Sequence, residues 1–205
     1  MMPTVSQVVA AAASRSDLPS GTVTFVFTDI EGSTKLAHAL GTDRWREVLV
    51  QHAAAVRSAA LKHEGVEVRT EGDAFFLAFR TARQAVAAAA DAQRALAAQN
   101  WPHGVTVRVR IGMHTGESAR PGDMESGADY VGYDVHQAAR VSSAAHGGQV
   151  IISSATRTLL GDQLPPGVTL LDLGEHRLKD IRRAERLFQL VIEGVPNDFP
   201  ALRTL

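Results

Sequence analysis

The segment Phe27–Thr34 (Phe-Thr-Asp-Ile-Glu-Gly-Ser-Thr) marks the point where a buried strand ends and a helix begins. Immediately before it, Thr22–Phe27 is a short β-branched and aromatic run, which is typical of a buried strand. After it, Ser33–His63 carries apolar residues at helical spacing with a break at Gly41. This pattern predicts two helices or one kinked helix. The chain therefore opens with a β-strand that passes directly into a helical unit.

Stretches with strand and helix character follow one another along the rest of the chain. The expected strands are Val66–Thr70, Ala74–Phe79, Val105–His114, Gln149–Ser153, Thr169–Arg177 and Glu185–Ile192. The expected helices are Thr81–Ala98, Tyr130–His146 and Ser154–Leu160. The order predicts an α+β fold, with a ferredoxin-like βαββαβ core and an extended antiparallel sheet. We expect residues 1–20 to be a leader, 21–193 the folded domain and 194–205 a tail.

Composition limits both the size of the fold and the class of protein. With 205 residues and 45% hydrophobic content, the chain suffices for one well-buried core but not for two ordinary domains. The net charge of −1 comes from mixed charges, so we expect neither a nucleic-acid nor a membrane partner. The absence of cysteine excludes a disulfide framework and a cysteine nucleophile. The apolar run Val8–Ala13 is too short to span a bilayer and lacks a basic flank, so a cytoplasmic location is expected.

The turn after the first expected strand has the chemistry of a phosphate site. Gly32, Ser33 and Thr34 open a helix whose N-terminal amides could bind phosphates. The carboxylate of Asp29 lies beside them and could bind Mg²⁺. The simpler explanation is that Asp29 or Ser33 caps the helix, and it is the better one for this motif alone.

A second carboxylate, that of Asp73, strengthens the case that Asp29 binds a metal ion. Asp73 follows Gly72 at the expected tip of a hairpin, where aspartate is common for purely structural reasons. In a ferredoxin-like sheet, however, the first strand lies beside the central hairpin, so Asp29 and Asp73 would meet. Two such carboxylates could hold a pair of Mg²⁺ or Mn²⁺ ions about 4 Å apart, an arrangement suited to in-line attack on phosphorus.

Histidines give weaker signals. His136 and Arg140 are four residues apart and therefore share one face of a helix, which taken alone indicates no more than a solvated face. The segment His114-Thr115-Gly116 is expected to be structural. His52 and the remaining histidines have no ligand-like spacing and are expected to be surface or core residues.

Four separated motifs together resemble the catalytic domain of class III adenylyl and guanylyl cyclases, especially a bacterial subgroup found in actinobacterial regulators. The motifs are Phe27–Thr34, Gly72–Phe75, Asp129–Arg140 and Leu173–Lys179. They occur in the family's order between about Gly21 and Ile192. The resemblance implies an adenylate cyclase for intracellular signalling, which converts ATP to 3′,5′-cyclic AMP and pyrophosphate. It also implies two Mg²⁺ or Mn²⁺ ions per site, in sites at a homodimer interface.

The resemblance also implies a role for each matching residue. The expected metal ligands are Asp29, Asp73 and the backbone carbonyl of Ile30. The expected phosphate contacts are the backbone amides of Gly32, Ser33 and Thr34 and the side chain of Lys179. Arg140 would stabilise charge on the α-phosphate, and Asp129 would accept a hydrogen bond from the adenine amino group. In the family, the metal ligands come from one subunit, and the base-reading and transition-state residues come from the other.

Two positions depart from the family's pattern. Arg69 stands where the family has a lysine that reads adenine, and arginine is longer and forked. His136 stands where the family has an asparagine that positions the ribose, and its charge varies with pH. These changes leave open a slow enzyme, an altered base choice with GTP as substrate, or a catalytically weak or inactive domain retained for nucleotide binding and dimerisation.

The choice of base and product follows from the same residues. A carboxylate at Asp129 favours adenine, whereas guanine would favour an acidic residue in place of Arg69. A diguanylate cyclase would carry a Gly-Gly-[Asp/Glu]-Glu-Phe hairpin, which this chain lacks.

Overall fold

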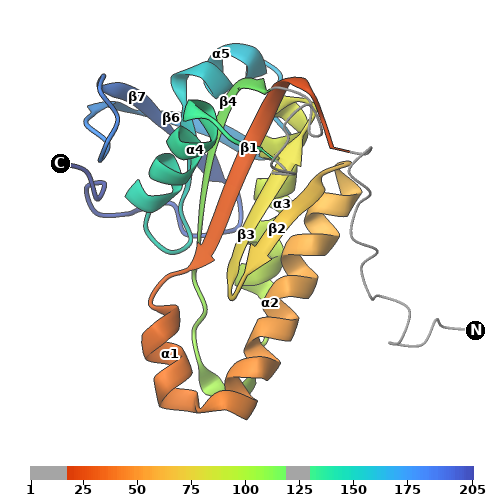
Figure 1. Cartoon of the computed structure of the whole chain (residues 1–205). Coiled ribbons are helices and arrows are strands. Elements are labelled where there is room, and N and C mark those ends of the chain that lie inside the picture. Colours follow the sequence, from red (N-terminus) through yellow and green to blue (C-terminus); the bar gives the residue numbers. More distant parts are fainter. Residues whose placement is uncertain (1–17, 119–129) are drawn as a thin grey trace, which may run out of the picture.

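One mixed sheet of seven strands organises the part of the chain that the computed structural model describes, residues 18–118 and 130–205 (Figure 1). Its strand order is β2-β3-β1-β4-β5-β7-β6. The strands are β1 (Gly21–Ile30), β2 (Val66–Glu71), β3 (Ala74–Phe79), β4 (Val109–Ser118), β5 (Val150–Ser153), β6 (Val168–His176) and β7 (Glu185–Ile192). β4 and β5 run parallel, and the other described neighbours run antiparallel. The order β4-β1-β3-β2 confirms the predicted ferredoxin-like core.

Helices cover both faces of this sheet. They are α1 (Ser33–Leu40), α2 (Thr42–Lys62), α3 (Ala82–Ala98), α4 (Tyr133–Ala144) and α5 (Ser154–Leu160), with a short 3₁₀ helix at Pro102–Gly104. Gly41, with a φ of 77°, separates α1 from α2 and confirms the predicted break. No helix in the described part of the chain is long and apolar enough to cross a membrane.

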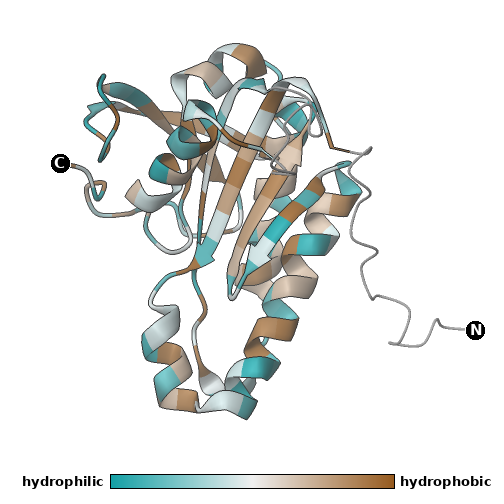
Figure 2. Cartoon of the chain, in the orientation of Figure 1, coloured by the Kyte–Doolittle hydropathy of each residue, from teal (hydrophilic) through white to brown (hydrophobic). Residues whose placement is uncertain are grey.

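Strand β1 lies in the middle of the core and is buried on both faces. Val26 and Ile30 pack with α2 and α3 on one face, whereas Val23 and Phe25 pack with residues of α4 on the other. Figure 2 shows the hydrophobic residues concentrated along β1 and β3. Double burial explains why this segment reads as a continuous apolar run rather than an alternating one.

Strand β4 differs from its predicted span. It begins at Val109 rather than Val105, and it runs through Ser118, beyond the predicted end at His114. Its register with β1 extends from Ile30↔Val109 to Gly21↔Ser118, so its partner's length sets both ends. The alternation of Val105–His114 did not contain this information.

Helix α4 is also shorter than expected. Gly132, with a φ of 134°, precedes it, and the helix ends at Ala144 rather than His146. Tyr130, expected in the helix, instead lies before it and donates its hydroxyl to the carbonyl of Pro19 (2.6 Å).

Residues 194–205 lie against the domain. Arg203 N–H donates to the Ala144 carbonyl (3.0 Å), and Leu205 N–H donates to the Arg177 carbonyl (3.1 Å). The side chain of Arg203 pairs with Glu31. These contacts link the end of α4 to the segment beyond β6, and the domain boundary at residue 193 stays a prediction.

Candidate active site

The ends of two neighbouring strands bring Asp29 and Asp73 to the same edge of the sheet. Asp29 is the penultimate residue of β1, and Asp73 lies in the turn between β2 and β3. β1 pairs with β3 up to Thr28↔Phe75, and the Ile30 N–H then donates to Asp73 Oδ2 (2.7 Å). Both carboxylates are half-buried. The structure thus brings together the three residues predicted as metal ligands.

An arginine that the sequence motifs did not indicate shares this edge. Arg110 lies opposite Asp29 in the β1–β4 register, and its Nε and Nη2 donate to Asp29 Oδ1 (2.7 Å) and Oδ2 (2.5 Å). The hydrogen bonds to Asp29 raise the pKa of Arg110 above its usual value, and the charges of Glu31 and Asp73 add to this effect. The guanidinium therefore lies in the field of several carboxylates. Only the strand register, which the sequence motifs do not contain, could have revealed it.

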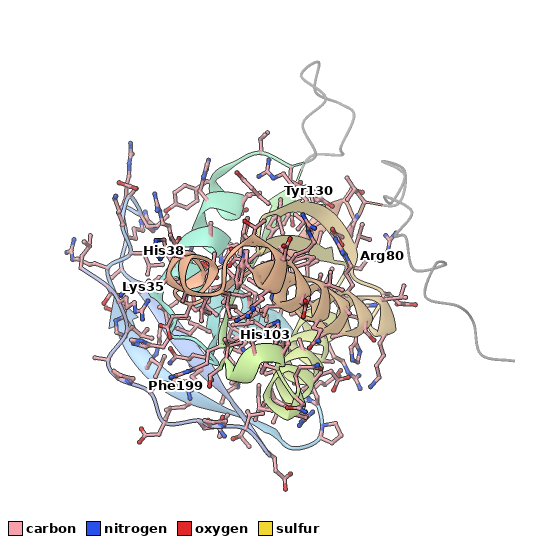
Figure 3. All side chains as sticks on the ribbon, turned by 90° about the horizontal axis from the view of Figure 1, so that it is seen from below. Lys35, His38, Arg80, His103, Tyr130 and Phe199 are labelled. Carbon is pink, nitrogen blue, oxygen red and sulfur yellow. The ribbon has the colours of Figure 1, made fainter. Side chains whose placement is uncertain are left out.

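Helix α1 begins without a side-chain cap. Its N-cap is Gly32, in the left-handed conformation with a φ of 70°, and no side-chain hydrogen bond caps the helix. The alternative that Asp29 or Ser33 serves as the cap is therefore not what the structure shows. Amides at an uncapped helix N-terminus favour anions. Figure 3 views the molecule from below, along α1 from its C-terminal end, with Lys35 and His38 labelled beside that helix.

Arg140, on α4, is ion-paired with a residue of the segment between β6 and β7. Its Nη2 donates to Asp180 Oδ2 (2.6 Å), and the two side chains are 38% and 63% exposed. Lys179, next to Asp180, is exposed, as is His136 one turn before Arg140. The structure therefore places Lys179 and Arg140 in one neighbourhood, open to solvent.

Each chain thus carries two separate groups of candidate residues. Asp29 and Asp73 pair with Arg110 and Ile30 at the ends of the central strands, while Arg140 pairs with Asp180. Within residues 18–118 and 130–205, no hydrogen bond or ion pair joins the first group to Arg140.

The structure describes only one of the two residues expected to read the base. Arg69 is exposed on β2, beside a register shift between Glu67 and Arg69. Glu67, two residues before Arg69 on β2, accepts two hydrogen bonds from Arg57 on α2 (2.7 and 2.9 Å). The Glu67 carboxylate is therefore already paired with an arginine. Asp129 lies outside the described residues.

Known proteins are similar to this chain in sequence and in fold. The family model for the adenylate and guanylate cyclase catalytic domain matches residues 17–191. An uncharacterized protein of Mycobacterium tuberculosis is 38% identical over 189 residues, which cover 91% of this chain and 61% of that protein. The chain thus spans about three fifths of that relative's length.

Solved structures are similar over most of the chain. A Trypanosoma brucei adenylate cyclase in its monomeric state superposes with a TM-score of 0.83 at 26% identity, covering 93% of this chain and 97% of that one. The adenylyl cyclase CyaB from P. aeruginosa superposes with a TM-score of 0.68 at 26% identity, covering 83% and 94%. The match to the family model, which extends over most of the residues, shows that this chain belongs to the adenylate and guanylate cyclase catalytic domain family.

Proposed function

We propose that this domain is an adenylate cyclase that converts ATP to 3′,5′-cyclic AMP and pyrophosphate at two sites of a homodimer. The observation that carries the proposal is the convergence of Asp29 and Asp73 beside the uncapped start of α1. Carboxylates can hold Mg²⁺ and free amides can bind phosphates, and a nucleoside triphosphate site commonly uses both.

The donor set at this edge fits Mg²⁺ or Mn²⁺. Asp29, Asp73 and the Ile30 carbonyl offer oxygen ligands, and Mg²⁺ is commonly held by one or two carboxylates together with substrate phosphates. No group of three or more histidine, cysteine or acidic side chains in the described ranges is arranged to hold a metal ion by itself, so phosphate oxygens would have to complete the coordination. Two ions bound there would activate the ribose 3′-hydroxyl and neutralise charge on the triphosphate.

Arg110 has a role in this proposal that the motifs did not suggest. Its guanidinium forms an ion pair with Asp29. When Asp29 binds metal, the guanidinium would be released beside the position where the triphosphate arrives. It would then contribute to phosphate binding from the same subunit as the two carboxylates.

The homodimer supplies what a single chain lacks. In the described residues Arg140 is paired with Asp180 and not with Asp29 or Asp73 of its own chain, so we propose that it acts on the nucleotide bound by the partner's Asp29 and Asp73. A two-fold interface would create two such sites. Val131 and Tyr133, 51% and 53% exposed beside the start of α4, give this surface an apolar character suited to an interface. Because a T. brucei relative was solved in its monomeric state, assembly needs a direct test.

ATP is favoured over GTP on two grounds. The T. brucei and P. aeruginosa relatives are adenylate cyclases by description, and Asp129 matches an acceptor for the adenine amino group. The test is to incubate the purified protein with ATP or GTP and Mn²⁺ and to identify the product by mass. We expect cyclic AMP from ATP. Absence of a cyclic nucleotide with either substrate would overturn the proposal.

A further inference from the structure

A buried polar network lies beneath the start of α4, away from both groups of candidate site residues. His114 on β4 is 6% exposed, and its Nδ1 lies 2.8 Å from the hydroxyl of fully buried Ser153. Its Nε2 lies 3.5 Å from Asp134 Oδ1, in the first turn of α4. Ser153 accepts a hydrogen bond from Thr156 N–H (3.3 Å), and its hydroxyl also lies 3.2 Å from the hydroxyl of Thr156. If Ser153 donates to Nδ1, the imidazole is the Nε2–H tautomer, which donates toward Asp134.

The side chain of Asp134 contacts the backbone of β4 directly. The Glu117 N–H donates to Asp134 Oδ2 (3.0 Å). A Cβ added at Gly116 would lie 2.0 Å from that oxygen and 2.6 Å from the Cβ of Asp134. Gly116 does not have a positive φ, so the backbone conformation does not require glycine there. Its lack of a side chain is what lets α4 approach this closely.

A second polar contact fixes the same face of the helix. Gln137, one turn after Asp134, donates to Glu185 Oε2 on β7 (2.8 Å). Ala138 and Val141, which follow Gln137 on α4, are fully buried and supply apolar packing. Apolar packing alone permits sliding and rolling, whereas directional contacts to a carboxylate and an amide select one orientation. The exposed residues of α4, including His136 and Arg140, are then held at fixed positions.

We propose that Asp134 and His114 are positioning residues for the cyclase reaction, because they set the orientation from which α4 presents Arg140 and His136 to the nucleotide. The inference rests on the proposed function. Neither residue would touch the substrate. Displacing a transition-state contact by about 1 Å costs on the order of 100-fold in rate, so an anchor at the start of α4 should act mainly on kcat.

The charges around His114 are consistent with this arrangement. Asp134 faces it from α4 and Glu185 from β7, and both favour the protonated ring. Burial outweighs them and lowers the pKa of His114 below its usual value. The lowered pKa favours the neutral ring at pH 7.

Single variants give the first test. Asp134→Asn has one acceptor oxygen where Asp134 meets both Glu117 N–H and His114 Nε2, so one of these two contacts is lost. We therefore expect kcat to fall about 10- to 100-fold while KM for ATP changes less than about twofold. The matched control is Asp91→Asn, which removes a carboxylate 2.8 Å from His63 on the other side of the sheet and should leave kcat unchanged. If Asp134→Asn fails to fold, two variants of His114 test the proposal instead. His114→Gln retains a donor and an acceptor and should keep most activity, whereas His114→Ala should lose it.

The distribution of mutations between the two chains of a dimer gives the sharper test. Differently tagged chains allow two heterodimers with identical mutations to be purified. In one, Asp73→Ala and Asp134→Asn lie on the same chain and the partner is wild type, so the only site with intact metal ligands uses the altered α4. In the other, the mutations lie on opposite chains, so that site uses an intact α4. We expect the first to be 10- to 100-fold slower than the second.

The outcomes separate the two proposals. A wild type that makes no cyclic nucleotide overturns the proposed function and this inference with it. An active wild type with equal rates in the two heterodimers, or an Asp134→Asn variant with full kcat, overturns the inference alone.

Discussion

Across the β1–β4 pair, the guanidinium of Arg110 contacts both carboxylate oxygens of Asp29, with Nε 2.7 Å from Oδ1 and Nη2 2.5 Å from Oδ2. A cation is therefore bound to one of the two carboxylates proposed to hold the metal ions. Metal binding and this ion pair compete for the same oxygens, which makes the pair directly testable.

Arg110→Met should separate metal binding from turnover. Removing the competing cation should tighten binding of Mn²⁺ alone by about tenfold, since a charge pair near a protein surface is worth roughly 1–4 kcal/mol. Turnover should fall about 10²- to 10³-fold, because a charge facing the triphosphate is lost. Titration with Mn²⁺ in the absence of nucleotide measures the first effect. Arg186→Met is the matched control, because Arg186 also contacts both oxygens of a carboxylate, that of Asp172, through Nε and Nη2 across the β6–β7 pair. Equal Mn²⁺ affinity in the Arg110→Met and wild-type proteins would contradict this account of the pair.

Asp73→Ala should abolish turnover without unfolding the domain. The substitution removes a metal ligand and one hydrogen bond to the Ile30 N–H, at a cost of about 1 kcal/mol of stability. Chemical denaturation and a cyclic AMP assay with Mn²⁺ measure the two effects separately. Near-normal activity would show that Asp73 binds no essential metal ion.

His52 should make the domain sensitive to acid. It is fully buried against Phe75, and both ring nitrogens lack a partner among the described residues. Burial lowers its pKa from 6.5 to about 4, with Arg57 acting in the same direction and Asp73 opposing it. The unfolded state therefore binds the proton more readily. Stability is complete above pH 6.5 and is lost as the pH falls toward 4, by up to about 3 kcal/mol.

Denaturation curves at pH 7.5, 6 and 5 measure this loss. His52→Leu should flatten the pH dependence, leaving the smaller contribution of buried His114, which has the same sign. The exposed His38→Gln variant is the control. An unchanged pH dependence in His52→Leu would show that another group is responsible.

Restoring the family's residues at positions 136 and 69 should improve the enzyme rather than impair it. His136 is exposed on α4, so replacing it should cost little stability. His136→Asn should raise turnover, because asparagine is smaller and keeps its donor at every pH. Arg69→Lys should mainly lower KM for ATP or sharpen the preference over GTP. Steady-state kinetics with both nucleotides tests each variant. A lower kcat in His136→Asn would show that His136 contributes to turnover in this site.

Turn residues that mark the ends of strands and helices allow much of the fold to be predicted from the sequence. Ala74–Phe79 and Glu185–Ile192 were predicted with their observed bounds, because turn residues flank these apolar runs. The convergence of Asp29 with Asp73 followed from topology alone. Arg110 and Asp134 were not predicted, because each depends on a strand register or a close backbone approach that no local pattern contains. The start of β4 was wrong for the same reason, since pairing with β1 sets it.

The central claim is that each site combines Asp73 of one chain with Arg140 of the other, and complementation between two inactive variants tests it most directly. Asp73→Ala and Arg140→Ala should each be inactive alone. A mixed dimer would contain one doubly damaged site and one intact site. Mixing the two proteins should therefore restore cyclic AMP production, with about half of the dimers carrying one intact site if exchange is random. No recovery, with subunit exchange demonstrated by differently tagged chains, would contradict the account and place both residues in a site on one chain.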